Sequence, residues 1–167
     1  KFKISRGTRK VSDVIVVELT DDNYSGRGEC FPYARYGEDI NSVQDQIKAV
    51  QSDIEDGADR HAVMDIMPPG AARNAIDCAL WDLESKRAGA RVWDLAKLST
   101  PEPVTTVFTL GVDDPSIMGE KARENYLRPR LKLKMTGDGL DLERVRQIHT
   151  NAPAARLVVD ANEGWSI

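Results

Sequence analysis

Two lysines spaced two residues apart are the first feature of this sequence that could do chemistry. The run Leu131-Lys132-Leu133-Lys134 alternates apolar and basic residues, so a strand here would place both lysines on one face. Each ammonium disfavours the charge of the other and burial adds to this effect, so one lysine could act as a base. The plainer alternative is an amphipathic strand that buries its leucines and leaves its lysines in water.

A carboxylate at the end of a later apolar run is the second candidate. Asp160 follows Leu157-Val158-Val159, and Asn162 lies two residues further along. A carboxylate in this place suits a hard cation such as Mg²⁺, which prefers oxygen ligands. The alternative is an aspartate that caps a turn or the next helix. Because Mg²⁺ needs more oxygens than Asp160 supplies, its other ligands would come from later strands or from the substrate.

Three further features could contact a substrate. Thr109, in an apolar strand, could hydrogen-bond a substrate group or simply fill a strand position. Arg6 and Arg9 could clamp a carboxylate through paired hydrogen bonds, or could lie in solvent. The loop from Tyr33 to Glu38 mixes aromatic and charged residues, which suits a specificity lid with Tyr36 as a substrate contact, although an ordinary packed loop has the same composition.

The first hundred residues predict strands followed by helices. Strands are expected over residues 1–5, 14–19 and 24–30, and helices over 41–54, 61–67 and 71–86. Gly26 and Gly28 indicate a close backbone approach in the third strand, and the small residues of the third helix permit close packing. This order is typical of an α+β domain.

The remaining residues follow a different rhythm. Strands over 105–110, 130–135 and 155–160 alternate with helices over 115–126 and 140–149, which predicts a parallel sheet with crossover helices. The last helix is expected to bury Leu142, Val145 and Ile148. Prolines near residues 98–103 mark the boundary, so the predicted domains are 1–98 and 103–167. The lysines and Asp160 then approach the carboxyl ends of parallel strands, where barrel enzymes do their chemistry.

Composition excludes some classes of function. The sequence has 23 basic and 27 acidic residues and no basic run, so nucleic acid is not an expected partner. No apolar stretch is long enough to cross a bilayer and no secretory signal is present, so a cytoplasmic location is expected. Cys30 and Cys78 match no zinc or redox spacing and are expected to be free thiols. Because the sequence lacks an initiator Met and stops after an apolar run, we expect a piece of a longer protein.

Four stretches together carry a resemblance to a known family. They are residues 28–38, residues 70–83, the Lys-x-Lys at Lys132 and Lys134, and the Asp-Ala-Asn-Glu-Gly-Trp at residues 160–165. In this order they resemble the enolase superfamily, in its muconate-lactonising-enzyme-like subgroup, and within it the L-Ala-D/L-Glu epimerases. The resemblance implies an α+β capping domain followed by the first part of a modified (β/α) barrel of the TIM type.

The resemblance also implies roles for the candidate residues. Lys134 would be the general base at the substrate α-carbon, and Lys132 would contact the substrate carboxylate and depress the pKa of Lys134. The remaining implied roles are Asp160 as a Mg²⁺ ligand, Asn162 as its support, Thr109 and Tyr36 as substrate contacts, and Arg9, or else Arg6, as the partner of the distal carboxylate.

The implied function is Mg²⁺-dependent epimerisation of Ala-Glu-type dipeptides. Removal of a proton next to a carboxylate leaves negative charge on two oxygens, which the cation and Lys132 would stabilise as an enediolate. The family takes its other metal ligands and the opposing lysine from later strands, so the 167-residue chain alone is expected to be inactive. The alternatives are a muconate cycloisomerase, an o-succinylbenzoate synthase, or a non-catalytic fragment that pairs with another chain. Assembly into a homo-oligomer is a further possibility.

Overall fold

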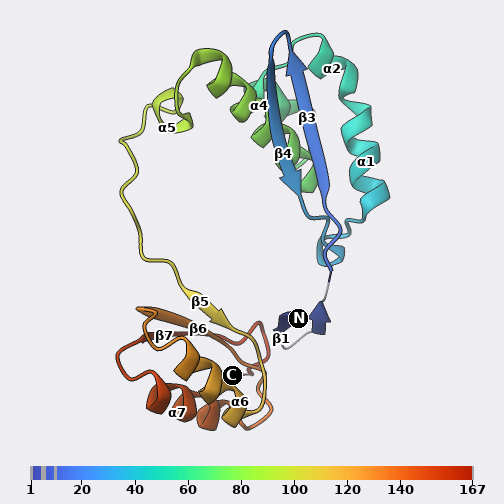
Figure 1. Cartoon of the computed structure of the whole chain (residues 1–167). Coiled ribbons are helices and arrows are strands. Elements are labelled where there is room, and N and C mark those ends of the chain that lie inside the picture. The colour runs from blue at the N-terminus through green and yellow to red at the C-terminus, as the bar shows by residue number, and fades with distance from the viewer. Residues whose placement is uncertain (1, 5–6, 10, 167) are drawn as a thin grey trace. The chain divides into compact units, whose positions relative to one another are not determined.

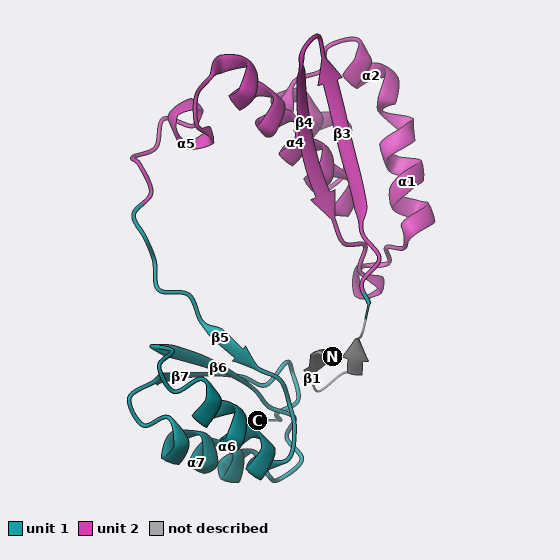
Figure 2. Ribbon diagram, viewed as in Figure 1, with its two compact units in different colours: residues 1–11, 102–167 teal, residues 12–101 magenta. Residues whose placement is uncertain are grey.

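The computed structural model describes residues 2–4, 7–9 and 11–166, with side chains from residue 11 onward. The chain divides into two compact units, one of residues 12–101 and one that contains residues 102–166 (Figure 2). The first two strands, β1 (Phe2–Ile4) and β2 (Gly7–Arg9), pair with each other in antiparallel fashion.

The unit of residues 12–101 pairs a two-stranded antiparallel sheet with helices. The strands are β3 (Ile15–Asp21) and β4 (Tyr24–Cys30). The helical elements are η1 (Ala34–Tyr36), α1 (Ile40–Ala49), α2 (Gln51–Glu55), α3 (Arg60–Ile66), α4 (Ala71–Ala88) and α5 (Val92–Leu95). The predicted order of strands and then helices is confirmed. The helix predicted over residues 41–54 is divided at Val50 into α1 and α2, and the short helices η1 and α5 were not predicted.

Two glycines let strand β4 lie directly against helix α4. A Cβ atom on Gly28 would lie 1.9 Å from the carbonyl oxygen of Ala75, and one on Gly26 would lie 2.1 Å from that of Ala79. Because no side chain fits in these gaps, both positions require glycine. The close backbone approach predicted from the sequence is therefore present.

The unit of residues 102–167 is a three-stranded parallel sheet with two crossover helices (Figure 1). Its elements in chain order are β5 (Phe108–Leu110), α6 (Pro115–Glu124), β6 (Arg130–Lys134), α7 (Asp141–Asn151) and β7 (Arg156–Asp160). The strand order β5-β6-β7 confirms the predicted β-α-β-α-β rhythm. Strand β5 begins at Phe108, three residues later than the sequence pattern indicated.

Helices α6 and α7 cover one face of this sheet. Leu131 and Leu133 of β6 are fully buried and belong to one core with Met118 and Ile148. The prediction that Leu142 is buried is wrong, because this residue of helix α7 is 63% exposed. Among the described residues, no helix is both long enough and apolar enough to cross a membrane.

Candidate functional site

Both candidate lysines bind the candidate carboxylate. The Nζ atom of Lys134 lies 2.7 Å from Oδ2 of Asp160, and the Nζ atom of Lys132 lies 2.8 Å from the same oxygen. The sequence separates Asp160 from these lysines by more than twenty residues, so the fold brings the three groups together.

The register of the parallel sheet explains this arrangement. Lys134 lies opposite Asp160 on β7, and Lys132 lies opposite Thr109 on β5. Side chains alternate along a strand, so Lys132 and Lys134 share the face opposite to Leu131 and Leu133. Thr109, both lysines and Asp160 therefore lie on the sheet face that α6 and α7 do not cover.

Burial separates the two lysines. The Lys134 side chain is 9% exposed, whereas that of Lys132 is 32% exposed. The reading of a strand whose lysines lie in water is therefore wrong for Lys134. A buried ammonium is costly without a partner, and Asp160 supplies that partner.

The two ammonium groups also set the charge state of the carboxylate. Hydrogen bonds from Lys132 and Lys134 hold the pKa of Asp160 well below its usual range. The backbone N–H of Asn162 donates to the other oxygen, Oδ1, at 3.0 Å. Asp160 is thus a carboxylate at neutral pH and is held at both oxygens.

The turn after Asp160 has an unusual backbone. Asn162 and Glu163 have φ angles of 49° and 64°, in the left-handed region. This conformation costs about 1–2 kcal/mol for a residue such as Glu163, whereas asparagine adopts it more readily. The backbone N–H of Gly164 donates to the carbonyl of Ala161 at 2.9 Å and closes the turn. Surrounding contacts must therefore stabilise residues 161–164 in this shape.

A buried arginine, which the sequence pattern did not indicate, lies at the same edge of the sheet. Arg144 of α7 has a side chain only 4% exposed. Its Nε donates to the carbonyl of Asp113 at 2.8 Å, and its guanidinium donates to Asp138 at 2.6 and 2.7 Å and to Asp141 at 2.7 Å. A longer bond of 3.4 Å reaches Oγ1 of Thr136. Asp141 and Arg144, three residues apart at a helix start, were the signal available in the sequence.

Asp141 extends this arrangement to the chain after β7. Its Oδ2 accepts from the Trp165 indole at 2.7 Å and from the backbone N–H of Gly137 at 2.8 Å. Burial acts to raise the pKa of Asp141, but the hydrogen bonds from Trp165, Gly137 and Arg144 outweigh it and leave the pKa lowered. Asp141 is therefore ionised and connects the loops that follow β6 and β7.

Asp160 is suited to supply one ligand of a magnesium ion. Asp160 offers a partly exposed carboxylate at the carboxyl edge of the sheet, and oxygen is the donor that Mg²⁺ prefers. Within residues 2–4, 7–9 and 11–166, no group of three or more His, Cys, Asp or Glu side chains could hold a metal. Asp160 could serve only as part of a site completed by other groups.

The remaining predicted substrate contacts belong elsewhere in the chain. Tyr36 lies in η1, is 75% exposed, and has its ring centroid 5.7 Å from that of Tyr33. Glu38 accepts from the backbone N–H of Ala71 at 2.7 Å and so fixes this loop to the start of α4. A pocket of about 740 Å³ beside the loop is lined in part by Tyr33, Tyr36 and Glu38.

The two arginines of the first strands have no described side chain. Arg6 lies outside the described residues, and of Arg9 only the backbone, in β2, is described. Their predicted role as partner of a substrate carboxylate stays a prediction.

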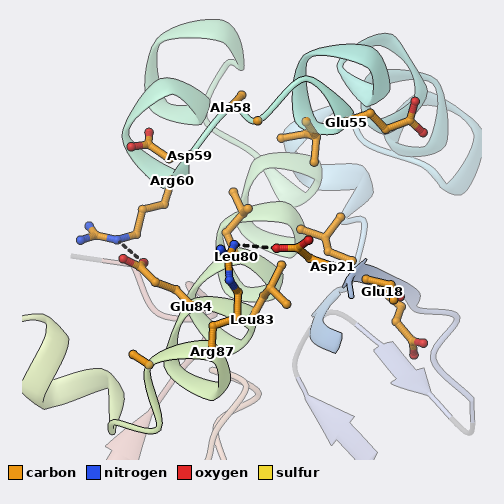
Figure 3. Close-up of a pocket in the computed structure, with 15 residues that line it drawn as sticks. Glu18, Asp21, Glu55, Ala58, Asp59, Arg60, Leu80, Leu83, Glu84 and Arg87 are labelled. Atoms are coloured by element: carbon orange, nitrogen blue, oxygen red, sulfur yellow. Dashed lines mark hydrogen bonds and ion pairs between the residues drawn. The ribbon is translucent and has the colours of Figure 1, made fainter. Parts of the chain in front are cut away.

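A larger pocket of about 930 Å³ lies between β3, α4 and the segment that leads into α3 (Figure 3). Arg87 pairs with Asp21 at 2.7 Å and Arg60 pairs with Glu84 at 2.9 Å, so these charges neutralise each other within the pocket. None of the residues predicted for chemistry lines it.

Comparison with known proteins gives the family. Residues 1–96 match the N-terminal domain of the mandelate racemase / muconate lactonizing enzyme family. An enolase family member from Agrobacterium tumefaciens, described as having homology to dipeptide epimerases and solved with sodium and L-Ala-L-Glu, has 44% identity and a TM-score of 0.92. That comparison covers 98% of this chain and 50% of the Agrobacterium chain.

Named relatives include racemases and epimerases. The L-Ala-D/L-Glu epimerase of Escherichia coli K12 is 43% identical over 98% of this chain and 51% of the relative. An N-acetyl-D-glutamate racemase from Pseudoalteromonas is 35% identical over 91% of this chain and 48% of the relative. The chain thus spans about half the length of these relatives.

The α+β capping domain and the start of a (β/α) barrel, both predicted from the sequence, are the fold of these proteins. The chain belongs to the mandelate racemase / muconate lactonizing enzyme family of the enolase superfamily.

Proposed function

We propose that this chain supplies one half of the active site of a Mg²⁺-dependent dipeptide epimerase, an isomerase that acts on Ala-Glu-type substrates. The observation that carries the proposal is the pair Lys132 and Lys134 on one sheet face, both within 2.8 Å of Asp160. The E. coli relative, named as an L-Ala-D/L-Glu epimerase, supports the choice of substrate.

Each lysine is proposed to carry out one step. Lys134, in its neutral form, takes the proton from the α-carbon next to the substrate carboxylate, and this proton then resides on Nζ. Lys132, two residues earlier on the same face, donates to the carboxylate oxygens as negative charge develops on them. A group on the opposite side of the α-carbon returns a proton and completes the inversion.

Asp160 is the residue of this chain that would hold the metal. When bound, Mg²⁺ supplies Lewis-acid stabilisation of the substrate carboxylate. Asn162 supports Asp160 through its backbone N–H, and the remaining ligands would come from outside this chain. Thr109, opposite Lys132 on β5, is proposed to contact the substrate from the neighbouring strand.

The proposal extends to the organisation of the whole protein. Residues 1–98 would form the capping domain, in which Tyr36 and Arg9, or else Arg6, contact the distal part of the dipeptide. Residues 103–167 would begin the barrel. The other half of the barrel would carry the opposing acid and the missing ligands, so the 167-residue chain alone is proposed to be inactive. A cytoplasmic location is proposed with it.

A substrate screen tests this function. The chain would be joined to the second half of the E. coli epimerase and assayed with Ala-Glu dipeptides, N-acetylglutamate and muconate in the presence of Mg²⁺. The proposal expects turnover of Ala-Glu to exceed that of the other acids. Preference for N-acetylglutamate would favour a racemase like the Pseudoalteromonas relative, and failure on every dipeptide would rule out the epimerase.

A further inference from the structure

We propose that Asp141, Arg144 and Trp165 form a positioning network that sets the conformation of the turn at residues 160–164. This turn carries Asp160 and Asn162, so the network determines the direction in which the Asp160 carboxylate faces. The inference rests on the proposed function for its catalytic meaning, but the network itself is independent of any substrate.

Arg144 is the anchor of the network. Its guanidinium is buried and bonds the loop after β5 through Asp113 and the loop after β6 through Asp138. Charge-assisted, bidentate hydrogen bonds of this kind fix the orientation of the two side chains as well as their distance, and a lysine cannot form them. The second carboxylate that Arg144 binds is that of Asp141, at 2.7 Å.

Asp141 connects Arg144 to the chain after β7. Its Oδ2 receives the Trp165 indole N–H at 2.7 Å. Nearby, the loops after β6 and β7 meet backbone to backbone, because a Cβ on Gly137 would lie 2.1 Å from the carbonyl oxygen of Gly164. Trp165 therefore fixes one end of the turn while strand β7 fixes the other.

The turn needs this support because of its backbone. Asn162 and Glu163 both lie in the left-handed region, which residues other than glycine and asparagine rarely adopt, so Glu163 in particular needs support. The backbone N–H of Asn162, at the start of this turn, donates to Oδ1 of Asp160 at 3.0 Å. Loss of the Trp165 contact would let the turn relax and would weaken the bond at Oδ1 of Asp160, while the two lysines still bind Oδ2.

Amide hydrogen exchange on the full 167-residue chain tests the network. The variants are Trp165→Phe, which removes the indole donor and keeps an aromatic ring, and Asp141→Asn, which removes the charge of the acceptor. Trp93→Phe in α5 is the matched control. We expect the amides of Asn162 and Gly164 to exchange about tenfold faster in the first two variants, as loss of one charge-assisted bond implies. The amides of Leu131 and Leu133 in β6 should keep their rates.

A second measurement tests the consequence for the metal. In the chain joined to a complete barrel, Trp165→Phe should weaken binding of Mn²⁺, measured by calorimetry, about tenfold, while KM for the dipeptide at saturating Mn²⁺ stays unchanged. Arg144→Lys should weaken it as well, because it keeps the charge but loses the planar donors.

Unchanged exchange at Asn162 and Gly164 would overturn the network, and so would equal acceleration throughout β6, which would indicate general destabilisation. Unchanged Mn²⁺ affinity beside altered exchange would overturn its positioning role. If the protein of unaltered sequence bound no Mn²⁺, the proposed function would fail, and the exchange rates alone would decide whether the network holds the turn.

Discussion

The substitution Asp160→Asn should destabilise the unit of residues 102–167 strongly. It removes the negative charge that two ammonium groups share, at 2.7 Å from Lys134 and 2.8 Å from Lys132. A charge pair at such a distance is worth about 6 kcal/mol at an effective dielectric constant of about 20, which sets an upper bound. Removal of one partner of a buried pair costs about 3–5 kcal/mol in measured cases. Because Asp160 is 25% exposed and Lys132 can turn to solvent, we expect the substitution to lower the free energy of unfolding by about 2–3 kcal/mol.

Urea titration followed through the amide signals of Leu131 and Leu133 would report the free energy of unfolding of this unit. Lys121→Gln is the matched control, since it removes an exposed partner of Asp113 at a similar distance of 2.8 Å in the same unit. Lys121→Gln should lower the free energy of unfolding by only about 0–1 kcal/mol. Equal small effects of both substitutions would refute the reasoning, because they would show that Lys134 does not depend on Asp160 for its burial. A stabilised Asp160→Asn variant would refute it as well.

Three other outcomes follow from the same edge of the sheet. Gly137→Ala should lower the free energy of unfolding by about 3 kcal/mol, because the new Cβ would collide with Gly164 and Gly137 has a φ of 78°. Gly139→Ala is the control: Gly139 has a φ of 85° but open space around it, so this substitution should cost only the backbone strain of about 1–2 kcal/mol. Urea titration would compare the two variants. Hydrogen bonds from lysines and from Arg144 lower the pKa values of Asp160 and Asp138 in the folded state, so their stabilisation is complete above about pH 4 and is lost as the pH falls towards the folded pKa. Acid unfolding of the unit should therefore be shifted to higher pH in Asp160→Asn, and an unshifted acid midpoint by circular dichroism would contradict this. Calorimetry of the chain alone should detect no Mg²⁺ binding at about 1 mM, since one carboxylate is too few ligands, and tight binding would show that the chain holds a complete site.

The sequence was most informative where periodicity and site chemistry agreed. Alternation at residues 130–134 predicted a strand with both lysines on one face, and the parallel register then placed Asp160 beside them. The apolar run before Asp160 was sufficient to predict the last strand, because buried parallel strands are nearly continuous in apolar residues.

Helix α7 shows why the same approach has limits. Leu142 was expected in the core, yet the buried side chain in the first turn is that of Arg144. Periodicity assigns apolar residues to the interior and does not anticipate a buried charged group whose partners Asp113 and Asp138 come from other loops. Contacts between loops depend on tertiary structure, so the network through Asp113, Asp138 and Trp165 was not visible in the pattern.

The loop of residues 31–38 illustrates a second limit. Its composition indicated a substrate contact at Tyr36, and the structure shows how Glu38 fixes the loop to α4. Whether Tyr36 meets a substrate depends on parts of the protein that lie beyond its own unit, so this role stays a prediction.

The central claim, that Lys134 is the base on one side of the substrate α-carbon, is tested most directly by proton exchange. The chain joined to the second half of the E. coli epimerase would be incubated in D₂O with L-Ala-L-Glu or L-Ala-D-Glu and Mg²⁺, and loss of the Glu α-proton signal would be followed by NMR. The unaltered protein should exchange the α-proton of both epimers. In Lys134→Ala, exchange should fall by about 10²–10⁴ for one epimer and persist for the other, since a base on one side reaches only one configuration. Equal exchange of both epimers in Lys134→Ala, at the unaltered rate, would contradict the account.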